Sequence, residues 1–259
     1  MPETEVPVLS ERRGDLLLIT LNRPQARNAV NTELAGALAE QLDRLDSDSE
    51  LRGAVLTGAG KGFSAGADLK ALVRGESGSH PERGFAGIVR RGPVKPIIAA
   101  VEGFAVAGGF EIALACDLII ASENAVFALP EPKVGLAALA GGVHRLPRQI
   151  GLKRAMGMIL TARHVSAKEG FELGFVNEVV PAGKALEAAE RWAETIAKNS
   201  PMSIRASKQA IQKGLNVSLE QAIAEQREYP AVKAMAASQD YIEGPKAFAE
   251  KRPPKWLGR

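Results

Sequence analysis

The stretch "KPIIAAVEGFAVAGGFEIALACD", residues 95–117, decides the fold class of this chain. Its first apolar run, Ile97 to Val101, follows a proline and contains β-branched residues, which predicts a buried strand. Gly108 and Gly109 then precede a second apolar run, which predicts a short helix through about Cys116. A strand followed closely by a helix is the repeating unit of α/β proteins.

The same alternation extends to both sides of this stretch. Short apolar runs predict further strands at 16–21, 54–57, 118–121, 125–128 and 176–180. Helical patterns predict helices at 31–46, 152–160, 167–173 and 183–198. Residues 74–91 are polar and contain glycines, and they predict a flexible loop. We therefore expect residues 1–199 to form one α/β domain.

The strand patterns disappear after about Ser200. Amphipathic helices are predicted at 204–213 and 218–227, and the polar tail "EGPKAFAEKRPPKWLGR" follows. An all-helical region spanning only 200–259 is too small to build a substantial core of its own. We expect it to pack on the main domain or on another subunit.

Composition narrows the class of protein. The chain has 259 residues, of which 46% are hydrophobic and 24% charged, as in ordinary globular proteins. The net charge of +3 comes without a run of like charges, which argues against a nucleic-acid tail. No apolar run approaches the ~20 residues of a membrane helix, and the polar start is unlike a signal or transit peptide. Cys116 is the only cysteine, which excludes an internal disulfide and favours the cytoplasm.

A possible nucleophile lies in "GKGFSAGADL", residues 60–69. Gly62 to Gly66 reads G-x-S-x-G, the pattern of a serine-hydrolase elbow. The predicted strand at 54–57 ends well before Ser64, however, so the tight turn of an elbow is absent. None of the three histidines lies in a recognisable triad context. A serine hydrolase therefore remains an alternative without further support.

The small residues offer a second use, because they expose the backbone. Gly66 and Ala67 lead into a helix start, as Gly108 and Gly109 do. Free N–H groups at helix starts bind anions and developing oxyanions. Two such segments can place two donors on one carbonyl oxygen, which is an oxyanion hole. The alternative for the first segment is a plain turn, with Asp68 favoured by the helix dipole.

Two glutamates are candidates for acid–base chemistry. Glu111 follows the glycine pair within an apolar run, where an unpaired carboxylate is costly to bury, so we favour a functional role over a dipole role. Glu131 lies between two prolines, and a solvent-facing loop glutamate is equally compatible with that pattern. The sequence spacing does not show that the two meet. We expect Asp117, at the end of the same helix, to be structural.

Four stretches give the chain a specific resemblance. "LNRPQARNAV", "LTGAGKGFSAGADLK", "KPIIAAVEGFAVAGGFEIALACD" and "FALPEPKVGL" resemble, in order, the enoyl-CoA hydratase/isomerase family, also called crotonases. The resemblance covers essentially the whole chain, and the tail is similar to that of carnitinyl-CoA dehydratase-like members. It implies a crotonase-like spiral of ββα units over 1–199. It also implies a helical region over 200–259 that forms homotrimers, often paired into hexamers.

The resemblance also implies a chemistry. The substrate would be an acyl-CoA thioester, with coenzyme A as part of the substrate, no separate cofactor, no metal, and no nucleic-acid or membrane partner. The backbone N–H groups of Ala67 and Gly108 would form the oxyanion hole, with Glu111 as the water-activating base and Glu131 as the acid. The remaining matched positions would line the coenzyme A site: Ala26, Arg27, Ala65, Ala67, Asp68, Leu69, Lys70 and Gly108.

The expected activity is that of an enoyl-CoA hydratase, which adds water to a 2-enoyl-CoA. Ala107 replaces a glycine of the family pattern, and Ala138 and Leu139 replace a proline and a glycine beside the second glutamate. Leu139 could narrow the pocket for water or for the acyl group. The alternatives are a carnitinyl-CoA-type dehydratase, a Δ3-Δ2 enoyl-CoA isomerase and, more distantly, a non-catalytic RNA-binding relative.

Overall fold

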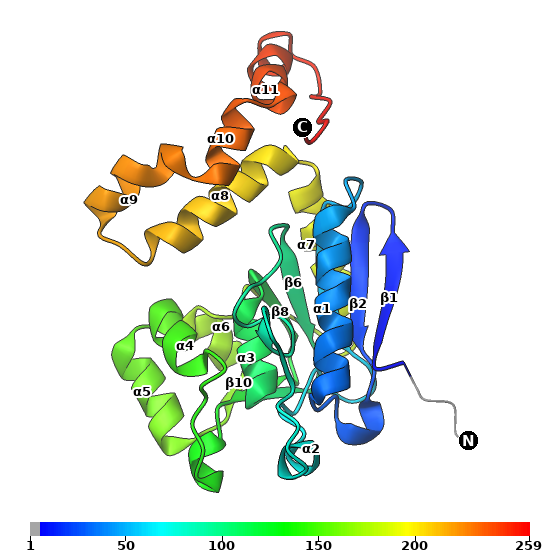
Figure 1. The fold of residues 1–259 in the computed structure, drawn as a ribbon, viewed down its shortest axis with the longest axis vertical. Helices are drawn as coiled ribbons and strands as arrows, with labels where there is room; N and C mark the ends of the chain where they lie inside the picture. The colour runs from blue at the N-terminus through cyan, green and yellow to red at the C-terminus, as the bar shows by residue number, and fades with distance from the viewer. Residues whose placement is uncertain (1–5) are drawn as a thin grey trace.

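The computed structural model describes residues 6–259 (Figure 1). Among these residues the main sheet has six strands, in the order β1-β2-β3-β6-β8-β11. They are β1 (Val8–Arg13), β2 (Leu16–Leu21), β3 (Gly53–Gly58), β6 (Ile97–Val101), β8 (Leu118–Ser122) and β11 (Glu178–Val180). β1 is antiparallel to β2, and the other neighbouring pairs are parallel. The predicted α/β fold is confirmed.

Helices cover both faces of this sheet, because parallel strands need long crossover connections. Successive residues of β2 enter opposite cores, as Leu17 and Leu18 do. The core that contains Leu17 includes α1 (Thr32–Ser47) and α3 (Gly108–Ala115), and the core that contains Leu18 includes α7 (Ala185–Ala197). Burial on both faces makes the strands continuous apolar runs, which is why they are recognisable in the sequence.

A second, smaller sheet lies beside the first. Its strands are β7 (Phe104–Val106), β9 (Val126–Ala128) and β10 (Val165–Ser166), in the order β10-β9-β7. β6 leads almost directly into β7, and β8 leads into β9 in the same way. The chain thus repeats a unit of two strands and a helix, of which β6, β7 and α3 are one example. This arrangement is the predicted spiral of ββα units.

The remaining helices surround this core or extend from it. Those around the core are α2 (Leu69–Val73), α4 (Gly142–Ile150), α5 (Leu152–Thr161) and α6 (Ala167–Leu173). The C-terminal helices, which project beyond one end of the sheet (Figure 1), are α8 (Pro201–Gly214), α9 (Leu219–Glu225), α10 (Pro230–Ala236) and α11 (Gln239–Ala249). A division of the chain at residue 200 stays a prediction. In residues 6–259 no helix has both the length and the apolar character needed to cross a membrane.

The prediction of a flexible loop over residues 74–91 is wrong from residue 79 onward. β4 (Ser79–His80) pairs with β5 (Gly84–Phe85), and the side chains of Arg83 and Ile88 are buried. A segment that contains a buried arginine and glycines at positive φ has the same amino-acid composition as a solvent-exposed loop. Composition therefore could not reveal that this segment is fastened to the core.

Sequence reasoning missed several elements, among them β1, β7, α4, α10 and α11, and α11 includes the start of the predicted polar tail. β1 is an edge strand in which only Val8 is buried, so its sequence lacks the apolar alternation of a strand. α4 contains Pro147, which normally ends a helix because it lacks an N–H donor. Here the proline lies near the end of the helix, and Leu146 and Ile150 fix the apolar face to the core.

Candidate active site

Two backbone segments that lie far apart in the sequence meet at one point. Gly66 has a φ of +90°, and a Cβ atom added there would lie 2.6 Å from the backbone nitrogen of Gly108. The segment around Ser64 runs beside β7, with hydrogen bonds from the Phe63 amide to the Phe104 carbonyl (2.9 Å) and from the Val106 amide to the Ser64 carbonyl (3.1 Å). The pairing along β7 therefore brings Ala67 close to Gly108.

The amides of Ala67 and Gly108 are free to act as donors. Within residues 6–259 neither N–H reaches a hydrogen-bond acceptor, although the amides of Gly66, Asp68 and Ala107 beside them do. The Asp68 amide donates to the Val30 carbonyl (2.9 Å), and the Ala107 amide donates to the Ala128 carbonyl (2.9 Å). Gly108 is also the first residue of α3, where the helix dipole favours negative charge. Two adjacent free donors are what an oxyanion hole requires.

Ala107 precedes this donor with an unusual backbone. Its φ of 52° lies in the region that favours glycine, which is the residue that many relatives are expected to have at this position. A positive φ at alanine carries a conformational cost of about 1–3 kcal/mol. Hydrogen bonds hold this backbone in place: the Ala107 amide donates to the Ala128 carbonyl, and the Ala107 carbonyl accepts the Glu111 amide at 3.1 Å.

The Ser64 side chain forms hydrogen bonds to the backbone and is not placed to act as a nucleophile. Its side chain is fully buried, and its hydroxyl donates to the Asn28 carbonyl (2.8 Å) and accepts from the Gly66 amide (3.1 Å). No histidine in residues 6–259 is hydrogen-bonded to it; His80, for example, accepts the amides of Glu82 and Arg83. The geometry gives no support to the serine-hydrolase alternative.

We expect the Ser64→Ala variant to keep most of its turnover and to lose about 1–3 kcal/mol of stability. The substitution leaves the Gly66 amide and the Asn28 carbonyl buried without a partner, which is the usual penalty for an unmade hydrogen bond. Steady-state kinetics and denaturant unfolding measure the two effects. Complete loss of turnover in a folded Ser64→Ala protein would restore the nucleophile hypothesis.

The two candidate glutamates approach the donors from neighbouring strands. β7 and β9 are parallel, with Val106 opposite Ala128. Gly108 and Glu111 follow the end of β7, and Glu131 follows the end of β9, so they emerge at the same edge of the small sheet. This topology brings together residues whose sequence spacing carried no information about their distance.

Glu111 is held in a nearly dry position. It is only 3% exposed, and its Oε1 accepts the amide of Gly142 at 2.8 Å. Burial raises its pKa to about 7, and the negative charge of Glu131 adds to the shift. The amides of Gly142 and Ala140 and the charge of Arg145 oppose that rise. A carboxyl group with a pKa near neutrality is suited to exchanging protons.

Glu131 is buried with an unused oxygen. It opens a short 3-10 helix, η2 (Glu131–Val134), and is 8% exposed. Burial raises its pKa above the ordinary range for a glutamate. Its Oε2 is buried, and no group in residues 6–259 donates a hydrogen bond to it. An unpaired buried oxygen is costly, so it is available to a water molecule or a substrate.

Sequence reasoning overlooked the contribution of α4. Its first residue, Gly142, supplies the amide that orients Glu111, and a Cβ there would come within 3.0 Å of the Glu111 Oε1. The signal was present: residues 140–142 read Ala-Gly-Gly, as residues 107–109 do, and both triplets precede or open a helix. Ala138 is buried, and its Cβ lies 3.0 Å from that same Cβ position, whereas Leu139 is 75% exposed and lines a cavity together with Phe85, Ala140 and Arg145.

The predicted coenzyme A positions lie on two segments that touch. The Ala65 amide donates to the Arg27 carbonyl (3.0 Å), which joins the stretch after Ser64 to the turn η1 (Pro24–Ala26). Ala67 forms an isolated parallel bridge with Val30. Ala26 is half-buried, and Arg27 is exposed. The structure therefore brings the two predicted coenzyme A segments into one surface.

Asp68 organises this surface through its side chain. Its Oδ1 accepts the amides of Lys70 and Ala71 at 3.1 Å each, which caps α2, and its Oδ2 pairs with Arg23 at 3.0 Å. Burial favours a higher pKa for Asp68, but these hydrogen bonds and the arginine outweigh it and lower the pKa. Leu69 and Lys70 remain exposed at the start of α2. Asp68 would thus act by holding the segment, since its carboxylate is already engaged.

Residues 6–259 contain no cluster of three His, Cys, Asp or Glu side chains arranged to hold a metal ion. The site consists of two free backbone donors beside a pair of buried carboxyl groups. Together with the spiral of ββα units, it defines the crotonase class of fold.

Comparisons with known proteins agree with this class. The family model described as enoyl-CoA hydratase/isomerase matches residues 11–259. A carnitinyl-CoA dehydratase of Salmonella typhi is 42% identical over 257 residues, which cover 96% of this chain and 97% of that protein. The chain belongs to the enoyl-CoA hydratase/isomerase family. The predictions of this family, of its fold and of an enzyme of the enoyl-CoA hydratase type are confirmed.

Solved structures match over nearly the full length. An enoyl-CoA hydratase from Mycobacterium marinum has a TM-score of 0.94 and 46% identity, covering 98% of this chain and 100% of that one. A carnitinyl-CoA hydratase from Mycobacterium avium has a TM-score of 0.80 and 45% identity, covering 99% and 100%. Similarity over the entire chain means that the C-terminal helices are shared along with the core.

Proposed function

We propose that this protein adds water reversibly across the 2,3-double bond of a 2-enoyl-CoA thioester. The observation that carries the proposal is the position of the free Ala67 and Gly108 amides beside the buried carboxyl groups of Glu111 and Glu131. The names of the relatives, which include enoyl-CoA hydratases and carnitinyl-CoA dehydratases, support a hydro-lyase.

The two amides would bind the thioester carbonyl oxygen. When water adds to C3, electrons move toward the carbonyl and an enolate forms. Two fixed N–H donors stabilise that oxyanion more than they stabilise the neutral carbonyl, which lowers the barrier. Loss of one such donor typically costs about 3 kcal/mol of transition-state stabilisation. Gly108 adds the positive end of the α3 dipole.

The carboxyl pair would move the protons. Glu111 accepts a proton from the attacking water as the new C–O bond forms at C3, and protonated Glu131 donates its proton to C2 as the enolate collapses. The pair starts with one proton and ends with one, now on Glu111, and exchange with solvent restores the starting state. Burial raises the pKa of both groups, so the pair holds one proton near neutral pH, and the reactive form is the one in which that proton lies on Glu131 while Glu111 is ionised.

The direct test is hydration of crotonyl-CoA and longer 2-enoyl-CoAs. The reaction is monitored through the decrease in the ultraviolet absorbance of the conjugated thioester. Wild-type protein should hydrate them, and the Glu111→Gln and Glu131→Gln variants should not. Unchanged turnover in both variants would contradict the assignment. A 3-enoyl-CoA converted faster than any 2-enoyl-CoA would instead favour the isomerase.

A dehydratase acting on a 3-hydroxyacyl-CoA is the second candidate, because a relative at 42% identity is named carnitinyl-CoA dehydratase. The chemistry is the same reaction in reverse. A higher kcat/KM for carnitinyl-CoA than for 3-hydroxybutyryl-CoA would favour it. In either case coenzyme A is part of the substrate, and we propose no separate cofactor, no metal, no nucleic-acid or membrane partner, and a cytoplasmic location.

We propose that residues 200–259 form a helical region that joins subunits into a homotrimer or hexamer. α8, α9 and the turn between them carry four apolar side chains that are more than half exposed: Ile211, Leu215, Leu219 and Ile223. A cluster of exposed apolar side chains of this kind usually marks a protein interface. The Leu215→Asp variant should therefore form smaller species than the wild type in light scattering. The Leu9→Asp variant, at an exposed position on β1, is the control, and a monomeric wild type would contradict the proposal.

A further inference from the structure

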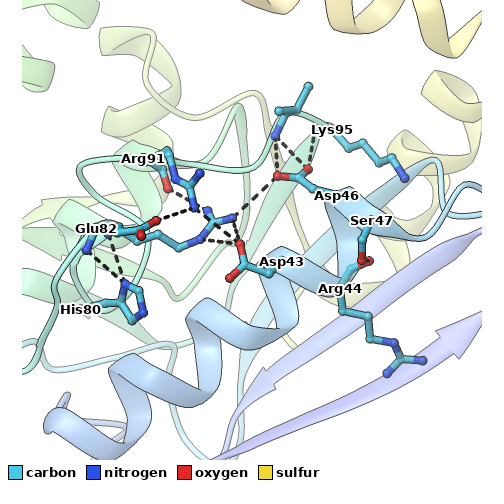
Figure 2. A network of polar contacts seen from close by, with 10 residues as sticks. Asp43, Arg44, Asp46, Ser47, His80, Glu82, Arg91 and Lys95 are labelled. Carbon is cyan, nitrogen blue, oxygen red and sulfur yellow. Dashed lines mark hydrogen bonds and ion pairs between the residues drawn. The ribbon is translucent and has the colours of Figure 1, made fainter.

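A buried arginine fastens the segment that precedes β6 to the core. Arg83 is 1% exposed, and its Nε donates to the Asp43 Oδ1 at 3.1 Å. Its Nη1 donates to the carbonyl of Arg91 at 2.9 Å, and its Nη2 lies 3.7 Å from the Asp46 Oδ2. Figure 2 shows Asp43 and Asp46, on the end of α1, facing the segment that carries Glu82 and Arg91. The guanidinium thus joins this segment to α1.

Side chains also contact the backbone at both ends of the segment between His80 and Lys95. Asp46 accepts the amides of Val94 (2.9 Å) and Lys95 (3.3 Å), just before β6 begins. At the other end the His80 Nδ1 accepts the amides of Glu82 and Arg83, each at 3.3 Å (Figure 2). Side-chain contacts therefore fix the turn between β4 and β5 and the end of the segment just before β6.

The segment needs such an anchor because its glycine-rich backbone has many accessible conformations. Residues 74–92 contain five glycines, at positions 75, 78, 84, 87 and 92, and glycine restricts the chain less than any other residue. A buried guanidinium is tolerated only when it is well paired, so its bonds to Asp43 and to the Arg91 carbonyl select one arrangement of the segment.

Phe85, two residues after Arg83, lies against the donor pair. A Cβ atom at Gly108 would lie 2.6 Å from the Phe85 Cε1, and a Cβ at Gly78 would lie 3.4 Å from the Cε2. That same Gly78 position is 3.0 Å from the carbonyl of Val30, the bridge partner of Ala67. The ring is half-buried, contacts the Gly108 side of the donor pair and lines a cavity there.

We propose that Arg83 is a positioning residue that holds Phe85 against Gly108, and that Phe85 limits the size of the acyl group admitted to the donor pair. This inference rests on the proposed function, in which the thioester carbonyl binds at Ala67 and Gly108. An acyl chain bound there has to pass the ring. Arg83 itself touches no reacting atom, and its influence on selectivity acts through Phe85.

A double-mutant cycle tests this coupling. The variants are Phe85→Ala, Arg83→Ala and both together, and the measured quantity is the ratio of kcat/KM for a ten-carbon 2-enoyl-CoA to that for crotonyl-CoA. We expect Phe85→Ala to raise the ratio about tenfold, the scale of a size change in an apolar pocket. Arg83→Ala should raise it in the same direction, and the double variant should match Phe85→Ala alone, because Arg83 has no further effect once the ring is gone.

Arg91→Ala is the matched control. Its guanidinium lies 3.6 Å from the same Asp43 oxygen, yet its side chain is 56% exposed, and the substitution leaves intact the carbonyl that Arg83 uses. The ratio should stay at the wild-type value. If Arg83→Ala does not fold, Asp43→Asn replaces it in the cycle, since Asp43 is 58% exposed and tolerates an isosteric change. An unchanged ratio in Phe85→Ala, or a double variant that shows the product of both shifts, would overturn the proposal.

Measurements of acyl-CoA binding distinguish a failure of this inference from a failure of the proposed hydratase function. Calorimetry with butyryl-CoA and decanoyl-CoA reports selectivity without turnover, and Phe85→Ala should shift it toward the longer chain. Active Glu111→Gln and Glu131→Gln proteins would reject the hydratase roles while leaving that shift in place. Wild-type binding selectivity in Phe85→Ala would reject the inference alone, and absence of acyl-CoA binding in the wild type would reject both.

Discussion

Replacing Glu111 by Gln is expected to lower kcat for crotonyl-CoA hydration by about 10³-fold, the usual contribution of a general base. The substitution removes the group that accepts the proton but keeps the shape of the side chain. The amide oxygen of Gln can still accept the Gly142 N–H, so the site stays formed. Stopped-flow or steady-state absorbance of the conjugated thioester measures the loss. Glu33→Gln, an exposed substitution on α1, serves as the control.

The Glu111→Gln variant is also expected to be more stable than the wild type at alkaline pH. The folded pKa of Glu111 is about 7, against an ordinary value of 4.5, so the folded protein binds this proton more tightly than the unfolded chain does. The protonated form makes its full contribution below pH 4.5, and that contribution is lost as the pH rises toward 7. Above pH 7 the buried negative charge of Glu111 lowers the free energy of unfolding by about 3 kcal/mol, and the neutral Gln side chain avoids this loss.

Denaturant unfolding at pH 4 and at pH 8 tests this linkage. Glu111→Gln and wild type should unfold alike at the lower pH, and the variant should resist denaturant more at the higher pH. Equal stability at both values would show that the carboxyl group is not held in a dry environment. Wild-type activity in a folded Glu111→Gln protein would remove Glu111 from the proton path.

Replacing Gly66 by Ala is expected to lower kcat by about 10²- to 10³-fold, as loss of an oxyanion donor does. A Cβ atom at this position would lie 2.6 Å from the Gly108 nitrogen and 2.9 Å from the Ala107 Cβ, so the two donor segments would have to separate. The forced separation and the positive φ should together cost about 2–4 kcal/mol of stability. Kinetics and unfolding on the same preparation measure both effects.

Gly75→Ala isolates the effect of the backbone conformation. Gly75 has a φ of +87°, close to that of Gly66, but a Cβ there would meet nothing within 4 Å. This variant should lose about 1–2 kcal/mol of stability and keep its kcat. If Gly66→Ala loses no more activity than Gly75→Ala, the approach of Gly66 to Gly108 is not what maintains the donor pair.

The sequence predicts those parts of the fold in which local pattern and tertiary environment agree. The helix over 31–46 is confirmed as α1, with Asn31 as its cap, because its leucines recur on the buried face. Asp117 is structural, as predicted: its Oδ2 accepts the Ile97 amide at 2.8 Å, which joins the end of α3 to β6. The buried strands are readable because both faces of the sheet are covered.

The rest depends on contacts between distant residues. The approach of Glu131 to Glu111 follows from the parallel pairing of β7 with β9, which no local pattern encodes. Arg83 appeared to be an ordinary loop arginine, because burial of a charge depends on partners such as Asp43 that lie elsewhere in the chain. The roles of the candidate residues stay predictions.

The two Ala-Gly-Gly turns have a consequence for natural variation in this fold. At residues 107–109 the turn presents an amide to the candidate substrate site, and at residues 140–142 it presents one to Glu111. Both depend on the absence of a side chain, as does Gly66. A relative can therefore keep both glutamates and still be inactive if it gains a single methyl group at one of these glycines. Inactive relatives of this kind would be recognised by a side chain at one of these glycine positions. A search for missing catalytic side chains would overlook them.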